Sequence, residues 1–223
     1  MSLRAVIFDF DGLILDTEMP EFVSWCEVFE TRGQVLDQTV WSRGVGTRDG
    51  FDPYLHLETL SGVIIDRGMI RAEVRARNEA LLEELVLLDG VEARLDEARE
   101  LGLKIGLASS ADRSWIDRHL DRFGLTSRFD AIRCTSDGLV AKPDPALYQA
   151  ALRELGCEAS EAVAFEDSPN GIAAAKAAGM MCIAVPNSIT SVLDLSAADA
   201  IVASLAGVSL RKLSETWGSG LVV

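Results

Sequence analysis

The sequence predicts an α/β protein built on a doubly wound parallel sheet, with an all-helical insertion after the first strand. In most of the chain, short apolar runs alternate with segments of helical spacing, as in a parallel sheet whose strands are joined by helices. The segment that follows the first apolar run shows helical spacing alone. We therefore expect a sheet domain made of residues 1–16 and 89–223, and a helical domain made of residues 17–88.

The first elements follow from local patterns. Residues 4–8 are almost entirely apolar, as expected of a strand buried on both faces. Apolar residues then recur at three- and four-residue steps over residues 22–29, between Pro20, which suits a first helical turn, and Gly33, which suits a helix end. A long helix is expected over residues 66–88, where apolar residues again have helical spacing.

The remaining elements alternate in type along the chain. Ser168-Pro169 has the signature of a helix cap followed by a first turn, and Gly179 suits the end of that helix. The expected helices centre on 95–101, 110–123, 146–155 and 169–179, and the expected strands are 104–108, 129–133, 162–165, 181–185 and 200–203.

Composition and charge exclude several classes of function. Hydrophobic residues make up 48% of the 223 residues, and 35 acids against 21 bases give a net charge of −14. Such a surface disfavours nucleic acid and anionic membranes as partners. No signal-peptide pattern, apolar span or sustained heptad is evident. The cysteines are far apart in sequence, which favours free thiols in a reducing cytoplasm: Cys26, Cys134, Cys157 and Cys182.

Polar side chains follow four of the expected strands or lie in the loops after them. In a parallel sheet these positions share one edge, where ligands bind. Together they offer acids for a cation, hydroxyls and a fixed positive charge, which is what a phosphoryl group needs. They are Asp9 and Asp11, Ser109 and Ser110, Lys142, and Glu166 with Asp167.

Each of these groups has an ordinary structural alternative. A serine can simply cap a helix, a lysine is usually solvated, and acids before a helix are favourable without any ligand. Two aspartates at a strand end can also be solvated acids. Their common order and placement favour a site over four separate coincidences.

The residues also carry a resemblance to a known family. Asp9-Phe-Asp-Gly-Leu-Ile-Leu-Asp-Thr17, then Ser109, then Lys142-Pro, then Glu166-Asp-Ser-Pro-Asn-Gly171 resemble the four ordered motifs of the haloacid dehalogenase superfamily. The resemblance spans nearly the whole chain, including the position of a helical cap. It is closest to the branch that contains β-phosphoglucomutase and small sugar-phosphate phosphatases.

The resemblance implies a role for each residue of these motifs. Asp9 is the nucleophile that forms an aspartyl-phosphate, and a carboxylate of ordinary pKa ~3.9 needs no base for this at neutral pH. Asp11 is the general acid and then the general base. Ser109 and Lys142 hold the phosphoryl group. Mg²⁺ is bound by Asp9, the backbone carbonyl of Asp11, Asp167 and, directly or through water, Glu166.

Departures from the family pattern narrow the reaction. Asp11 is present, whereas dehalogenases of the family lack this second aspartate. Glu21 stands where β-phosphoglucomutase carries a histidine, which favours a phosphatase over the mutase. Arg48 resembles a phosphate-gripping arginine and Arg77 replaces a lysine, so both, with Glu21, are candidates for binding substrate. For both arginines a solvated side chain is the ordinary alternative.

The expected function is therefore a Mg²⁺-dependent phosphatase of a small phosphorylated metabolite, most naturally a sugar phosphate. Phosphate transfer of the β-phosphoglucomutase type remains the alternative. A third interpretation is a receiver-type signalling module phosphorylated on an aspartate. That module lacks a large helical insertion and has its phosphoacceptor on a later strand, whereas Asp9 is on the first.

Overall fold

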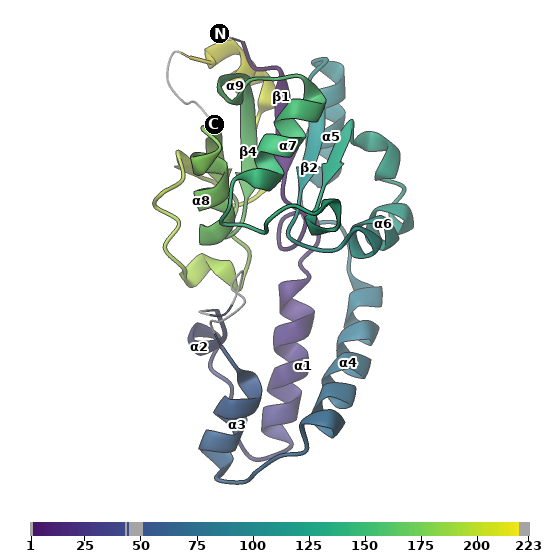
Figure 1. Cartoon of the computed structure of the whole chain (residues 1–223), viewed down its shortest axis with the longest axis vertical. Helices are drawn as coiled ribbons and strands as arrows, with labels where there is room; N and C mark the ends of the chain where they lie inside the picture. The colour runs from purple at the N-terminus through teal and green to yellow at the C-terminus, as the bar shows by residue number, and fades with distance from the viewer. Residues whose placement is uncertain (1, 43, 45–50, 219–223) are drawn as a thin grey trace.

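A computed structural model describes residues 2–42, 44 and 51–218, and its sheet has the expected parallel, doubly wound form (Figure 1). Among these residues, six strands lie in the order β3-β2-β1-β4-β5-β6, and every neighbouring pair is parallel. The α/β fold class is confirmed. The strands are β1 (Ala5–Phe8), β2 (Lys104–Ala108), β3 (Ala131–Arg133), β4 (Ala162–Glu166), β5 (Met181–Ala184) and β6 (Ala200–Ile201).

Helices cover both faces of the sheet because successive side chains of a strand point to opposite faces. In β1, Val6 and Phe8 join one hydrophobic core, whereas Ala5 and Ile7 join the other. The first core contains residues of α5 (Val91–Glu100), α6 (Arg113–Arg122) and α9 (Leu210–Thr216). The second contains residues of α7 (Ala146–Leu155) and α8 (Pro169–Ala177).

In the described part of the chain between β1 and α5, four helices form a separate helical region, which projects away from the sheet (Figure 1). It has its own hydrophobic core, in which Trp25, Phe29 and Leu57 are buried. The two long helices, α1 and α4, lie side by side. The helices are α1 (Glu18–Glu30), α2 (Gln38–Ser42), α3 (Pro53–Ser61) and α4 (Arg67–Glu84).

Helix ends differ most from the sequence-based expectation. The long helix ends at Glu84 and not at Leu88. Arg122, on α6, donates hydrogen bonds to the carbonyls of Leu82 (2.6 Å) and Leu85 (2.8 Å), and so satisfies groups that a longer helix would have bonded itself. The chain beyond is extended.

The helix expected to begin at Ser110 begins at Arg113. The sequence pattern also gave no indication of α9. Glu97, on α5, accepts hydrogen bonds from the backbone N–H groups of Leu210 and Arg211, and thereby caps α9 from a distant segment. None of the helices in the described part of the chain is long and apolar enough to cross a bilayer.

Candidate active site

The strand register brings the polar residues that follow β1, β2 and β4 to one level. Phe8 pairs with Leu107 of β2 and with Phe165 of β4. Asp9 therefore lies one step along from Phe8, next to the carboxyl end of both neighbouring strands. This is the point of the sheet at which the strand order reverses, where open parallel sheets bind ligands. The sequence-based prediction of a shared edge is confirmed.

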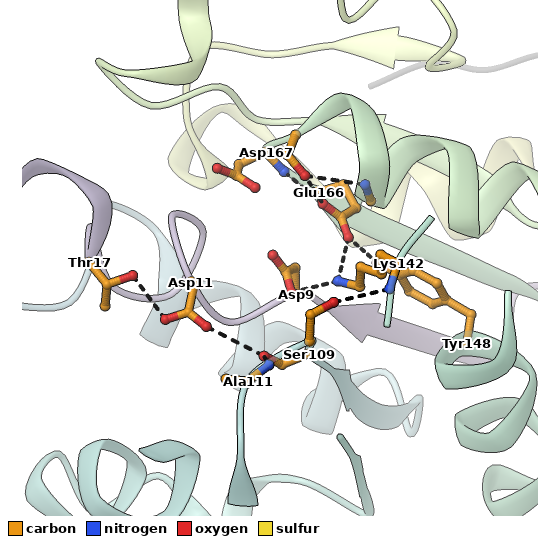
Figure 2. A network of polar contacts seen from close by, with 12 residues as sticks. Asp9, Asp11, Thr17, Ser109, Ala111, Lys142, Tyr148, Glu166 and Asp167 are labelled. Atoms are coloured by element: carbon orange, nitrogen blue, oxygen red, sulfur yellow. Dashed lines mark hydrogen bonds and ion pairs between the residues drawn. The ribbon is translucent and has the colours of Figure 1, made fainter. Parts of the chain in front are cut away.

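A buried lysine lies at the centre of the site (Figure 2). Lys142 Nζ is 2.6 Å from Asp9 Oδ1 and 2.6 Å from Glu166 Oε1, and its side chain is only 6% exposed. Burial alone would lower the pKa of Lys142, but the two carboxylates outweigh it and raise that pKa above its ordinary value. The lysine is therefore a permanent positive charge beside Asp9.

Glu166 anchors this lysine. The Glu166 side chain is fully buried, and its Oε1 also accepts a hydrogen bond of 2.6 Å from the Tyr148 hydroxyl. Lys142 Nζ in turn lies 5.0 Å from the centre of the Tyr148 ring. A Cβ at position 171 would lie 1.8 Å from Glu166 Oε2, so only Gly171 leaves room for this carboxylate.

Three buried acids converge on a position that suits a divalent cation. Asp9, Glu166 and Asp167 each offer a carboxylate oxygen, and these oxygens lie within 4.8 Å of one another. Lys142 balances only one of the three charges, and buried charges without compensation are costly. Carboxylate oxygens are the donors that Mg²⁺ prefers. The donor set and its excess negative charge therefore fit a divalent cation.

The same crowding changes the pKa of Asp9. Burial, and then the Glu166 carboxylate, raise the pKa of Asp9 to about 7, although Lys142 opposes the shift. Burial also raises the pKa of Asp167 well above its ordinary value, with Asp9 the next contribution. A bound cation would favour the ionised forms of both. Without a cation, the pKa of Asp9 therefore lies above the ordinary value on which the sequence-based expectation relied.

Asp11 is turned away from the three acids (Figure 2). Its Oδ1 accepts hydrogen bonds from Thr17 Oγ1 (2.9 Å) and from Trp115 Nε1 (2.8 Å), and its Oδ2 accepts one from Ser109 Oγ (3.4 Å). Burial raises the pKa of Asp11, and the bonds from Trp115 and Thr17 offset this only in part. A carboxyl group that keeps its proton more readily is suited to acid–base chemistry.

The two serines do not cap a helix. Ser109 Oγ accepts a hydrogen bond from the N–H of Ala111 (3.0 Å), and Ser110 Oγ accepts one from the N–H of Lys142 (3.1 Å). Because α6 begins only at Arg113, these serines lie in the turn that precedes it. Ser109 thus lies beside Asp11, and Ser110 holds the lysine loop.

The candidate residues of the helical region lie differently. Glu21 is exposed in the first turn of α1. Arg77 Nε is 2.8 Å from Glu27 Oε1, in an ion pair between α4 and α1 that is almost half exposed. No hydrogen bond or ion pair within the described ranges joins Glu21 or Arg77 to the buried acids. Arg48 lies outside the described residues.

Several side chains that hold the site together were not predicted from the sequence. Tyr148 and Trp115 lie inside helices and contact Glu166 and Asp11 only through the tertiary fold. Asn187 donates a hydrogen bond of 2.8 Å to Asp167 Oδ2. It follows the apolar run of β5, so the rule that pointed to the other strand ends could have found it.

The protein is thus an α/β protein with buried acids and a buried lysine gathered beyond the carboxyl edge of a parallel sheet. The chain belongs to the haloacid dehalogenase-like hydrolases, since the model of that family matches residues 6–185. The resemblance in its motifs is thereby confirmed.

The chain is also similar to proteins whose names describe them as phosphatases. The chain is 43% identical to "Putative phosphatase YhcW" of Bacillus subtilis, over 96% of this chain and 97% of that protein. It is 32% identical to hexitol phosphatase B of Escherichia coli K12, over 83% of this chain and 84% of that protein. Among solved structures, a haloacid dehalogenase family hydrolase of Deinococcus radiodurans with bound phosphate and sodium shares the fold, with TM-score 0.82, 24% identity and 99% coverage of both chains.

Proposed function

We propose that the protein is a Mg²⁺-dependent phosphatase that hydrolyses a small phosphorylated metabolite, a sugar phosphate, through an aspartyl-phosphate. The observation that carries the proposal is the set of charged groups around Asp9. One of its oxygens is bound to Lys142, and it shares a buried acidic cluster with Glu166 and Asp167, while Asp11 lies on its other side (Figure 2). This arrangement supplies a nucleophile, a counter-charge and a separate proton donor.

Two steps account for the hydrolysis. A free oxygen of Asp9 attacks phosphorus, the bond to the leaving oxygen breaks, and Asp11 in its neutral form gives that oxygen a proton. Asp11, now ionised, then takes a proton from a water molecule that attacks the aspartyl-phosphate. Asp9 is released together with inorganic phosphate. Lys142 neutralises charge on the transferring group throughout, and Ser109 binds a phosphoryl oxygen.

The residues around Asp9 would hold the cation. Asp9, Asp167 and the backbone carbonyl of Asp11 would be direct ligands. Both oxygens of Glu166 already have partners, Lys142 and Tyr148 at Oε1 and the N–H of Asp167 at Oε2, which favours a water between Glu166 and the ion. The ion would neutralise phosphate charge and keep Asp9 ionised.

The helical region, residues 17–88, would act as a cap over the substrate and exclude water from the edge of the sheet. Glu21, Arg48 and Arg77 are the candidates for recognising the part of the substrate beyond the phosphate. We favour a sugar phosphate because of the relatives: the name of hexitol phosphatase B indicates that it acts on a phosphorylated sugar alcohol.

The two alternatives are less well supported. For phosphate transfer of the β-phosphoglucomutase type, this chain lacks the histidine that the mutase carries, because Glu21 stands at that position. A receiver module has the strand order 2-1-3-4-5, with its ligand at a different switch point. The strand order here is β3-β2-β1-β4-β5-β6 and disfavours the receiver.

A substrate screen tests the proposal. The purified protein is incubated with Mg²⁺ and a panel of sugar, sugar-alcohol and other metabolite phosphates, and released phosphate is measured. Hexose 1-phosphates are assayed in parallel for isomerisation to the 6-phosphate. We expect phosphate release from at least one sugar phosphate and no isomerisation. Appearance of the 6-phosphate would establish the mutase instead, and a phospho-protein that forms without turnover would support the receiver.

A further inference from the structure

Asn187, in the loop after β5, uses both ends of its amide to join separate parts of the molecule. Its Oδ1 accepts hydrogen bonds from the N–H groups of Ile189 and Thr190, both at 2.9 Å. Two backbone donors at one end fix the orientation of the amide, so its Nδ2 must face the other way. There it donates to Asp167 Oδ2 (2.8 Å) and to the carbonyl of Gly12 (3.1 Å).

This contact leaves Asp167 little freedom. A Cβ at position 12 would lie 2.3 Å from Asp167 Oδ2 and 2.6 Å from Asn187 Nδ2. The Asp167 carboxylate is thus packed against the Gly12 backbone on one side and hydrogen-bonded by the amide on the other. Asp167 is 2% exposed, so bulk solvent has little access to its carboxylate. The hydrogen bond from Asn187 therefore helps to fix the rotation of the Asp167 carboxylate.

The loop that carries Asn187 is attached to the helical region. Gln38 Nε2, on α2, donates a hydrogen bond of 2.6 Å to the carbonyl of Ser188, and Ser42 Oγ donates one of 3.0 Å to the carbonyl of Ile189. Ile189 is fully buried, and it belongs to the hydrophobic core of the helical region and not to either core of the sheet. A residue of the sheet region thus anchors its loop in the other region.

We propose that Asn187 is the positioning residue of the metal ligand Asp167, and that α2 sets its place through the loop 187–190. The inference rests on the metal site of the proposed function. Mutation of a residue that hydrogen-bonds a metal-binding carboxylate typically lowers metal affinity or activity by about 10–100-fold. Placement of α2 against this loop therefore tunes how well the site holds its cation.

The direct test measures binding of Mn²⁺, used as a spectroscopic substitute for Mg²⁺, from the electron paramagnetic resonance signal of the free ion. Asn187→Ala should raise the dissociation constant by about 10-fold or more. The matched control is Ser191→Ala, next to this loop, which removes an exposed hydroxyl that, among the described residues, hydrogen-bonds the Ser188 carbonyl alone. The control should bind Mn²⁺ as the wild type does. A folded Asn187→Ala protein with wild-type affinity would overturn the inference.

A second variant tests the connection to the helical region without touching the site. Gln38→Ala combined with Ser42→Ala removes both donors to the loop carbonyls and should weaken Mn²⁺ binding by roughly 3- to 10-fold, less than Asn187→Ala. Thermal melting in EDTA shows that each variant is folded. Unchanged affinity in the double variant would overturn the role of α2.

The wild type separates failure of the inference from failure of the proposed function. Wild-type protein that binds Mn²⁺ but hydrolyses no phosphate ester overturns the proposed function and leaves the inference standing. Wild-type protein that binds no Mn²⁺ overturns both.

Discussion

The edge of the sheet and the helical region place their charged side chains in opposite ways. At the sheet edge, Lys142 and Glu166 are 6% and 0% exposed and form a close ion pair. In the helical region, Arg77 and Glu27 also form a close pair, but they are 43% and 45% exposed. Removing one partner of a buried pair leaves an uncompensated charge, whereas an exposed pair is replaced by water. The sheet edge is therefore a set of interdependent groups, whereas the Arg77–Glu27 pair of the helical region can be changed with little effect on stability.

Replacing Asp9, the proposed nucleophile, gives the largest effect expected from this contrast. Asp9→Asn should lower turnover of p-nitrophenyl phosphate by about 10⁴-fold or more, the scale on which loss of a nucleophile acts. The control is Asp194→Asn, an exposed acid whose carboxylate bonds the N–H of Ser196. Activity that persists in a clean Asp9→Asn preparation refutes the assignment of Asp9.

Removal of the cation should have nearly as large an effect. Treatment with EDTA should abolish hydrolysis of p-nitrophenyl phosphate, because Asp9, Glu166 and Asp167 then share one buried site with a single lysine. Added Mg²⁺ should restore the rate. Full activity in EDTA, or no recovery with any divalent cation, would show that the acids serve another purpose.

Lys142→Met removes the buried positive charge while keeping the length of the side chain. We expect kcat to fall by about 10²–10³-fold, and the free energy of unfolding to fall by about 3–5 kcal/mol. Lys176→Met is the matched control, since Lys176 and Asp199 form an ion pair that is 37% and 33% exposed. That control should lose about 1 kcal/mol or less in urea unfolding. Equal losses in the two variants would remove the distinction between buried and exposed pairs.

Glu18 lies where the two regions meet and should make stability depend on pH. Burial, and then Glu21 and Asp11, raise its pKa from the ordinary 4.5 to about 8. Between these values the unfolded chain binds fewer protons than the folded one, so this group lowers stability as pH rises. In EDTA, Glu18→Gln should therefore gain about 1–2 kcal/mol over the wild type at pH 8, roughly 3–6 °C in melting temperature, and almost nothing at pH 4.5.

The control for Glu18 is Glu30→Gln, which changes an exposed acid at the far end of the same helix. Its melting temperature should differ from that of the wild type by the same amount at both pH values. A gain for Glu18→Gln that does not grow with pH would show that Glu18 is ionised in the folded protein.

The smallest effect is expected from the exposed pair of the helical region. Arg77→Ala should change turnover of p-nitrophenyl phosphate by less than about threefold, because an exposed pair contributes about 1 kcal/mol or less and this substrate carries no sugar. Glu27→Gln, which removes the other partner, is its control. If Arg77→Ala alone lowers kcat/KM for a sugar phosphate found in the screen, Arg77 binds that substrate and does more than pair with Glu27.

Elements with strong local signals were predicted closely. The expected strand 104–108 and helix 146–155 coincide with β2 and α7. Those with tertiary determinants were not. The end of α4 is set by Arg122, from a helix far away in the sequence, and no pattern within α4 contains that information. The start of α9 has a local cap, because Ser209 Oγ accepts a hydrogen bond from the N–H of Lys212, but Glu97 of α5 also accepts hydrogen bonds from the N–H groups of Leu210 and Arg211.

The sequence by itself determined the parallel sheet and the residues gathered at its edge, because apolar runs and the polar residues that follow them are local features. It also determined the family. Only the tertiary structure decided the surroundings of each acid: Trp115 on Asp11, Asn187 on Asp167, and the crowding that raises the pKa of Asp9. These contacts join segments tens to more than a hundred residues apart, and burial and hydrogen bonding, which set the chemistry of a carboxylate, arise only once those segments are packed together.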